Sequence, residues 1–400
     1  MRIRRTAAFG LLALAALALA TLAVAIIADS GSGTPQPTTA APLHPVAGNF
    51  EPDATRPEDC SDPACLEQAY GNIAYSSGPQ RALTALEEEV GTATNECHRI
   101  AHNIGSASLA RFKGNVGRTF AEGSSTCASG YYHGVLSRAL VNVKSYGASA
   151  LGAVARGLCA GAEVTAVAEL EYQCLHGLGH GLMITTGFNL PTSLEVCDHL
   201  RGRWKATSCN GGVFMENFFT SYGGQSPWVR DDDPVYPCNK VAEEDKQTCY
   251  QLVTSRILRV IGVDWERTAE ICASVEMNWI ASCFESYGRD VAGQTKRDPE
   301  EIRELCAVAR PYDGERECIR FAALDMVAND KTGRQAAGLC DGTAGELRPA
   351  CYKAIGSIMA RSRTTRAESV ADCRSLTAAQ ADVNACIRGA AARLAAPLGR

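Results

Sequence analysis

Apolar residues recur at three- and four-residue spacing through much of the chain. Leu, Ile, Val, Met and Ala follow this spacing in residues 249–261, 318–327 and 351–361. The spacing is the period of an amphipathic helix. The segments that run into the preceding cysteines, such as residues 265–272 and 300–306, show a helical pattern as well. The hydrophobic pattern therefore predicts pairs of helices and no sheet.

The cysteines divide these helices into repeats. From Cys238 onward, the first cysteine of each pair recurs at intervals of 34, 34, 34 and 33 residues, a period typical of two-helix solenoid units. We expect each pair to staple the turn between two helices, and such a loop of about a dozen residues stabilises by about 3 kcal/mol. The expected disulfides are Cys159–Cys174, Cys197–Cys209, Cys238–Cys249, Cys272–Cys283, Cys306–Cys318, Cys340–Cys351 and Cys373–Cys386. Among the four earlier cysteines, we pair Cys60 with Cys65 and Cys97 with Cys127.

The predicted fold is thus an all-α, disulfide-stapled solenoid of αα-hairpin repeats with a period of about 34 residues. Its period resembles that of tetratricopeptide and Sel1-like repeats. The segment Ala69-Tyr70-Gly71-Asn72-Ile73-Ala74-Tyr75, followed by Gly78 and Ala82-Leu83, is similar to one tetratricopeptide unit. The later repeats lack that family's Trp, Gly and Tyr positions, so the resemblance implies architecture and at most a surface for a protein or peptide partner.

The N-terminus has the residue pattern of an export signal. A basic leader, Met1 to Arg5, precedes an apolar run from Ala7 to Ile27, which is long enough to span a bilayer. We expect residues 1–28 to be a signal peptide or, preferably, an uncleaved membrane anchor, and residues 29–58 to be a disordered tether rich in Pro, Thr and Ser. Histidine-rich repeats would occupy residues 59–237 and cysteine-paired repeats residues 238–400.

Composition indicates the compartment of the protein and limits its possible partners. Eighteen cysteines in an exported chain indicate an oxidising, extracytoplasmic location, either anchored at the cell surface or secreted. A net charge of -5 and the absence of a basic cluster beyond the leader argue against a nucleic-acid partner. The membrane would be a partner through the N-terminal segment.

The histidines follow the cysteines in a repeated phrase. Residues 127–134 and 174–181 both have the sequence Cys-x-x-Gly-x-x-His-Gly, and residues 209–216 keep the frame with Met215 in place of histidine. His98 and His102, after Cys97, have the same i, i+4 spacing as His176 and His180. On a helix each pair projects from one face, where two imidazoles can chelate one ion.

Registry between repeats predicts that these side chains meet. His133, His180 and Met215 each stand six residues after a cysteine, so on stacked helices they would be neighbours. The predicted metal ligands are His98, His102, His133, His176, His180 and Met215, with Glu216 as an alternative ligand to Met215. The cofactor would be a transition metal: copper, zinc or iron. If the site is catalytic, Glu216 is the candidate acid or base.

Two functions remain open at this point. The first is an anchored extracytoplasmic repeat protein whose histidines bind a transition metal that is catalytic, carried or structural. The second is a non-enzymatic interaction scaffold, in which the histidines cap helices and hydrogen-bond to neighbouring carbonyls. Glycines 177, 179 and 181 lie inside a predicted helix, where each costs about 1 kcal/mol relative to alanine. Close packing or a ligand at the helix surface would offset that cost.

Overall fold

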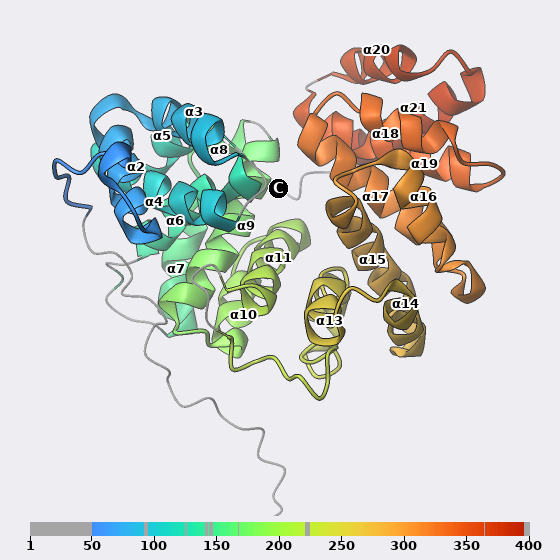
Figure 1. Cartoon of the computed structure of the whole chain (residues 1–400), viewed down its shortest axis with the longest axis horizontal. Coiled ribbons are helices and arrows are strands. Elements are labelled where there is room, and N and C mark those ends of the chain that lie inside the picture. Colours follow the sequence, from blue (N-terminus) through green and yellow to red (C-terminus); the bar gives the residue numbers. More distant parts are fainter. Residues whose placement is uncertain are drawn as a thin grey trace, which may run out of the picture. The chain divides into compact units, whose positions relative to one another are not determined.

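The computed structural model describes residues 50–91, 95–124, 126–140, 143, 147–166, 168–220, 225–363 and 365–395. Every regular element within these ranges is an α-helix or a short 3-10 helix. Longer and shorter helices follow one another along the chain, although not in strict alternation (Figure 1). The structure is therefore an all-helical array of disulfide-stapled repeats, which confirms the predicted fold class.

One set of helices is called the longer helices, although its member α6 has only 11 residues. Most of them pack against the next member of the set in chain order: α2 with α4, α4 with α6, α6 with α9, α9 with α11, α15 with α17, α17 with α19 and α19 with α21. Their bounds are α2 (Pro63–Ser77), α4 (Asn95–Arg111), α6 (Gly130–Leu140), α9 (Ala168–Thr185), α11 (Arg203–Phe218), α15 (Ile280–Gln294), α17 (Glu315–Asp330), α19 (Leu347–Met359) and α21 (Gln380–Ala395).

Shorter helices connect and cover the longer ones. They are α3 (Pro79–Val90), α5 (Val116–Ala121), α7 (Ala148–Leu158), α8 (Ala162–Thr165), α10 (Leu190–Asp198), α12 (Glu243–Tyr250), α13 (Thr254–Ile261), α14 (Trp265–Ser274), α16 (Pro299–Ala307), α18 (Arg334–Asp341) and α20 (Arg366–Leu376). The 3-10 helices are η1 (Pro57–Asp59), η2 (Cys127–Ser129), η3 (Met277–Trp279), η4 (Arg310–Tyr312) and η5 (Ala360–Ser362). Because α12 packs against both α11 and α15, the helices on the two sides of residue 237 are in contact through it.

Local sequence signals explain where several helices begin. Asp62 and Asp298 accept hydrogen bonds from the first free backbone N–H groups of α2 and α16, and a proline follows each at the first helical position. Thr365 and Glu368 form a reciprocal capping box at the start of α20. Such caps satisfy backbone donors that a helix leaves unpaired, and each typically stabilises the protein by about 1 kcal/mol.

All eighteen cysteines are paired as the sequence predicts. The seven repeat disulfides are Cys159–Cys174, Cys197–Cys209, Cys238–Cys249, Cys272–Cys283, Cys306–Cys318, Cys340–Cys351 and Cys373–Cys386. The two early pairs, Cys60–Cys65 and Cys97–Cys127, form as well. The predicted pairing is therefore confirmed in full.

The disulfides have a regular place in the repeats. In six of the seven repeat disulfides, the first cysteine lies at or near the end of a shorter helix, and the second lies in the first half of the next longer helix. Cys272 in α14 and Cys283 in α15 are one example, and Cys340 in α18 and Cys351 in α19 are another. Each of these six disulfides therefore fixes how one helical hairpin is folded. The exception is Cys238–Cys249, whose second cysteine lies near the end of the shorter helix α12.

One repeat differs from the expected pattern. No helix leads directly into Cys238, because residues 225–241 form turns, bends and irregular segments. Pro227, Pro234 and Pro237 lie in this stretch, and proline lacks the N–H that a helix interior requires. The helix expected after Cys249 is also interrupted, since α12 ends at residue 250 and α13 begins at residue 254.

The folded region begins before the predicted end of the tether. Phe50 is buried against Gly71 of α2. Asp53 and Asn72 exchange two hydrogen bonds of 3.0 and 2.7 Å. Residues 50–58 thus lie on α2 instead of belonging to a free tether. The expected anchor, within residues 1–28, lies outside the described residues. Among the helices that are described, none has both the length and the apolar composition of a membrane span.

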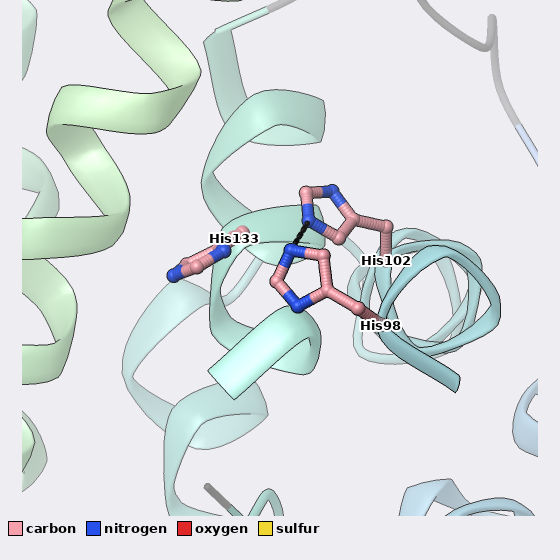
Figure 2. Close-up of side chains that lie close together, drawn as sticks. All are labelled: His98, His102 and His133. Carbon is pink, nitrogen blue, oxygen red and sulfur yellow. Dashed lines mark hydrogen bonds between the residues drawn. The ribbon is translucent and has the colours of Figure 1, made fainter. Parts of the chain in front are cut away.

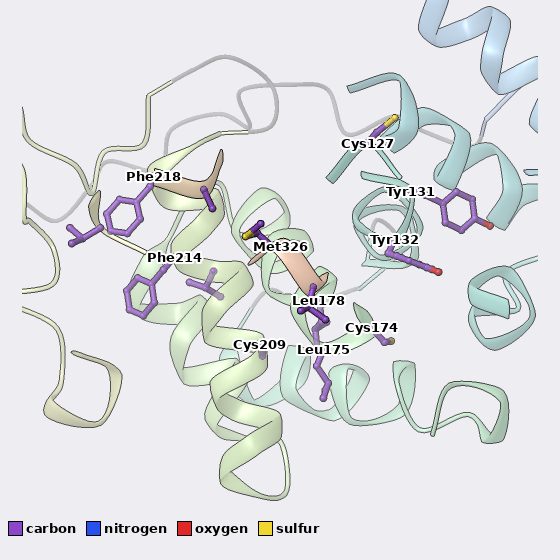
Figure 3. Packing of buried hydrophobic residues seen from close by; sticks show 14 of the residues in the cluster. Cys127, Tyr131, Tyr132, Cys174, Leu175, Leu178, Cys209, Phe214, Phe218 and Met326 are labelled. Atoms are coloured by element: carbon purple, nitrogen blue, oxygen red, sulfur yellow. The ribbon is translucent and has the colours of Figure 1, made fainter. Parts of the chain in front are cut away.

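Glycines bring the longer helices into backbone contact. A Cβ atom built on Gly356 of α19 would lie 2.0 Å from the carbonyl oxygen of Cys386 in α21, and one on Gly288 of α15 would lie 2.1 Å from that of Cys318 in α17. Only glycine allows such an approach. Buried side chains fill the remaining space, as Figure 3 shows for Tyr132 of α6, Leu175 of α9 and Phe214 of α11.

This packing predicts opposite effects for two glycine-to-alanine substitutions. Gly356→Ala should lower the free energy of unfolding by about 3 kcal/mol, because the added methyl group forces α19 and α21 apart. Gly338→Ala is the control: Gly338 is exposed within α18, and its Cβ would lie 3.9 Å from Pro299 and closer to no other residue beyond its own helix. It should stabilise by up to about 1 kcal/mol. Urea denaturation of the oxidised protein measures both, and equal effects would contradict the packing argument.

Candidate metal centre

Five histidines and one glutamate from four successive longer helices converge in the interior. His98 and His102 come from α4, His133 from α6, His176 and His180 from α9, and Glu216 from α11. Figure 2 shows the first three of these together. His98 is half-buried and the other five side chains are buried. Two groups of three, His98/His102/His133 and His133/His176/His180, each offer ring nitrogens within 4.8 Å of one another.

The pair on α4 is held by the disulfide next to it. Nδ1 of His98 lies 2.8 Å from the carbonyl oxygen of Cys127. A carbonyl can only accept a hydrogen bond, so this nitrogen carries the proton and Nε2 of His98 keeps its lone pair. That Nε2 lies 3.1 Å from Nε2 of His102, and the two rings meet edge to face. The two Nε2 positions therefore face one small region.

The pair on α9 has a corresponding arrangement. Nε2 of His180 lies 3.3 Å from Nε2 of His176. On the other side of the ring, Nδ1 of His180 lies 2.7 Å from Oε2 of Glu216, which is fully buried on α11. A carboxylate in this position fixes the tautomer of the histidine and orients its ring, as is common for metal-binding histidines.

His133 lies between the two pairs. Its ring centroid is 5.2 Å from that of His98 and 5.3 Å from that of His102, with the rings edge to face. On the other side it stacks on His180 at 3.8 Å, and its centroid is 5.9 Å from that of His176. Both ring nitrogens of His133 are buried, and neither makes a hydrogen bond within the described part of the chain.

These distances can be compared with those of imidazoles bound to one ion. With metal–nitrogen bonds of about 2.0–2.1 Å, two ligand nitrogens lie about 2.9 Å apart at right angles and about 3.4 Å apart at the tetrahedral angle. Their ring centroids then lie roughly 4.5–5.2 Å apart. The Nε2–Nε2 distances within the two histidine pairs, 3.1 and 3.3 Å, lie between these two nitrogen–nitrogen separations. The centroids of His98, His102 and His133, at 4.7, 5.2 and 5.3 Å, fit three ligands of one ion closely.

Burial keeps these imidazoles neutral. It is the largest cause that lowers the pKa of His176 and the pKa of His180 to about 3, and neighbouring imidazoles act in the same direction. Burial also holds the pKa values of His102 and His133 well below the usual range of histidine, again with support from the surrounding imidazoles. A neutral imidazole is the form that binds a metal ion.

Glycines next to the histidines permit this convergence. A Cβ atom on Gly134 would lie 1.9 Å from the carbonyl oxygen of His102, and one on Gly212 would lie 1.8 Å from that of His176. The backbones of α6 and α11 therefore rest directly on the helical turns that carry histidines. Close helix packing, the first explanation proposed for the glycines in these phrases, applies here.

The structure places the predicted site residues unequally. It brings together His98, His102, His133, His176 and His180, and it adds Glu216 through the hydrogen bond to His180. Met215 precedes Glu216 on α11 and is half-buried. Consecutive residues of a helix project about 100° apart, so Met215 faces another direction. His199 is exposed at the end of α10, next to Gly152 of α7.

Two groups that support the cluster were not predicted from the sequence. Tyr172 stacks on His176 with ring centroids 5.5 Å apart, and the carbonyl oxygen of Cys127 faces His98. Tyr172 stands four residues before His176, so the i, i+4 rule that identified the histidine pairs could have found it. The position of a backbone carbonyl cannot be predicted from the identity of the side chains.

Comparisons with protein-family models, with curated proteins and with solved structures found no match for this chain. The chemistry of the cluster therefore has to be argued from its own geometry.

The lowered pKa values predict that the metal-free protein loses stability in acid. An unfolded histidine takes up a proton near pH 6.5, whereas buried His176, with a pKa of about 3, does not at pH 5. Stability from such a group is therefore present above pH 6.5 and falls by about 2 kcal/mol per histidine on going to pH 5. His176→Phe should lose about 2 kcal/mol less than the unmodified protein between pH 7.5 and 5.

Chemical denaturation of the chelator-treated protein at both pH values measures this difference. His199→Ala serves as the control, because His199 is exposed and lies outside the cluster. Identical pH dependence for His176→Phe and the unmodified protein would show that His176 is not buried in its neutral form.

Proposed function

We propose that this protein is an extracytoplasmic, disulfide-stapled helical-repeat protein that binds a transition metal in the cluster of five histidines. The observation that carries the proposal is the convergence of imidazoles from three helices with their Nε2 atoms 3.1 and 3.3 Å apart in pairs. Five imidazole rings around one region, four of them buried and one half-buried, are costly to assemble unless they share a ligand.

The alternative, that the histidines serve only as hydrogen-bonding groups, accounts for part of the cluster. It explains the contacts of His98 with Cys127 and of His180 with Glu216, and it also explains the hydrogen bond between the two histidines of each pair. It leaves both nitrogens of His133 buried without a hydrogen bond among the described residues. Each buried polar atom without a partner costs about 1–3 kcal/mol. A bound metal would use a lone pair of His133 and so offset this cost.

The donor set indicates the class of metal. It consists of imidazole nitrogens, which suit copper, zinc, iron and nickel rather than calcium or magnesium. Glu216 is fully buried and faces Nδ1 of His180. We assign it the role of orienting that ligand, in place of acid or base catalysis on a substrate. With Met215 turned away, the thioether that would have favoured copper over the other metals plays no part in the proposal.

Burial limits what such a centre can do. Only His98 is partly accessible among the five histidines, so an ion would enter beside it. A bulky substrate cannot reach the interior, whereas an electron or a small molecule can. This favours a role in metal storage, electron transfer or reactions of small molecules over hydrolysis of a polymer.

The covalent structure of the protein supports the proposed location. Nine disulfides account for all eighteen cysteines, which favours an oxidising environment outside the cytoplasm. We propose that residues 1–28 anchor the protein in the membrane, with the repeats on the outer side. A protein or peptide partner on the repeat surface belongs to the alternative scaffold function and is not needed for metal binding.

Metal content is the direct test. We expect the full-length oxidised protein to retain copper, zinc or iron after dialysis, measured by elemental analysis. His102→Ala combined with His180→Ala removes one ligand from each pair and should lose the metal while circular dichroism stays unchanged. His199→Ala, which alters an exposed histidine, should keep it. If the unmodified protein binds none of the three ions, the scaffold function is the correct one.

The role of Glu216 predicts a smaller effect. Glu216→Gln retains a hydrogen-bond acceptor for His180 but removes the charge, and loss of such a supporting carboxylate typically weakens metal binding about 10–100-fold. Asp245→Asn is a matched control: Asp245 is a buried carboxylate on α12 that accepts a hydrogen bond from Asn210 at 2.7 Å. Competition with a chromophoric chelator measures both affinities. A loss of similar size in both variants would argue against a specific role for Glu216.

A further inference from the structure

Among the described residues, the five histidines form two groups of possible ligands and not one. A transition metal in a protein usually takes about four to six ligands, some of them from solvent, but here the imidazoles form two separate i, i+4 pairs on α4 and α9. The Nε2 atoms within each pair face each other at 3.1 and 3.3 Å. Each pair therefore already has the spacing of two ligands on its own ion.

His133 is the only residue that belongs to both groups of possible ligands among the described residues. Its two ring nitrogens are both buried and both without a hydrogen bond in that part of the chain. In Figure 2 one of them lies on the side of His98 and His102, and the other points away from that pair. A histidine that served one ion, or none, would be expected to use its second nitrogen in a hydrogen bond, as His98 and His180 do.

We propose that the cluster holds two transition-metal ions, one at each histidine pair, and that His133 bridges them through its two ring nitrogens. This inference rests on the proposed metal-binding function and goes beyond it in number and connectivity. A neutral imidazole offers one lone pair and one N–H. Binding of the second ion replaces that N–H proton, which leaves to the solvent, and no electron is transferred.

The two proposed metal positions, at the α4 pair and at the α9 pair, are not equivalent. His98, His102 and His133 have the ring separations of three ligands on one ion, so the first position is preformed. At the second position the rings of His133 and His180 stack at 3.8 Å, which is closer than ligands of one ion allow. This stack has to open before the second ion binds. The first ion therefore binds at the α4 pair and the second binds more weakly at the α9 pair.

Copper(II) is a suitable probe, because two copper ions joined through one imidazole ring couple magnetically and lose their paramagnetic signal. The full-length oxidised protein is cleared of metal and titrated with Cu²⁺, followed by elemental analysis and electron paramagnetic resonance. We expect the signal to rise up to one equivalent and to fall by at least half between one and two equivalents. With Zn²⁺ as the second equivalent, the copper signal should persist.

Variants test whether His133 is the residue that bridges the two ions. His176→Ala should leave one bound copper with its full signal, whereas His133→Ala should abolish the coupling even where two ions remain bound. Circular dichroism establishes that each variant folds, and the unmodified protein alone decides the main question if a variant does not. Saturation at one equivalent overturns the two-ion proposal and leaves metal binding intact. Two equivalents with undiminished signal overturn the bridge, and no bound metal overturns both.

Discussion

The direct contact between backbones of successive helices is the constraint on which the rest of this structure depends. Glycines at the crossing points remove the side chains that would otherwise hold two helices about 8–10 Å apart. At Gly134 and Gly212 a single added carbon would collide with a carbonyl oxygen of the facing helix. Because imidazole is a short side chain, rings from α4, α6 and α9 can meet only when those helices lie this close. The same contact thus sets both the packing and the chemistry of the N-terminal repeats.

Disulfides and glycines fix different contacts in the array. Six of the seven repeat disulfides join a shorter helix to the first half of a longer one, and Cys238–Cys249 joins an irregular segment to α12. The glycines govern the contact between longer helices. The two are physically close: the carbonyl oxygen of Cys209, itself disulfide-bonded, is the atom that would meet a Cβ on Gly179. The core is correspondingly rich in small and medium residues, with tyrosines such as Tyr131 and Tyr287 filling the larger spaces between layers.

The periodic parts of the structure could be predicted from the sequence. A regular cysteine period and helical apolar spacing are sufficient to give the helical hairpins and the repeat disulfides. Registry from the cysteines also brought His133 next to His180. Registry was less precise at the level of a single side chain. It placed Met215 at the position equivalent to His180, with Glu216 as the alternative, and Glu216 is the residue that contacts His180. A helix packed at a slightly different rotation turns a neighbouring residue inward, and the sequence of one helix does not reveal that rotation.

The irregular parts were predicted less well for related reasons. Three prolines removed the helix expected before Cys238, although that repeat keeps its disulfide. Residues 50–58 were assigned to a tether by composition, yet Phe50 and Asp53 pack on α2 through tertiary contacts that composition does not show. Short segments of mixed composition take their structure from what they pack against.

The disulfide between Cys97 and Cys127 has a consequence for when the histidine cluster can exist. Cys97 immediately precedes His98, and the carbonyl of Cys127 holds the ring of the same histidine. While both thiols are reduced, nothing covalent holds that carbonyl beside α4. For the proposed metal-binding function, this means that oxidation of the protein would come before metal loading. A chain exported before it folds, as proposed, would then take its metal from the supply outside the cytoplasm, and the place of folding would decide which metal it meets.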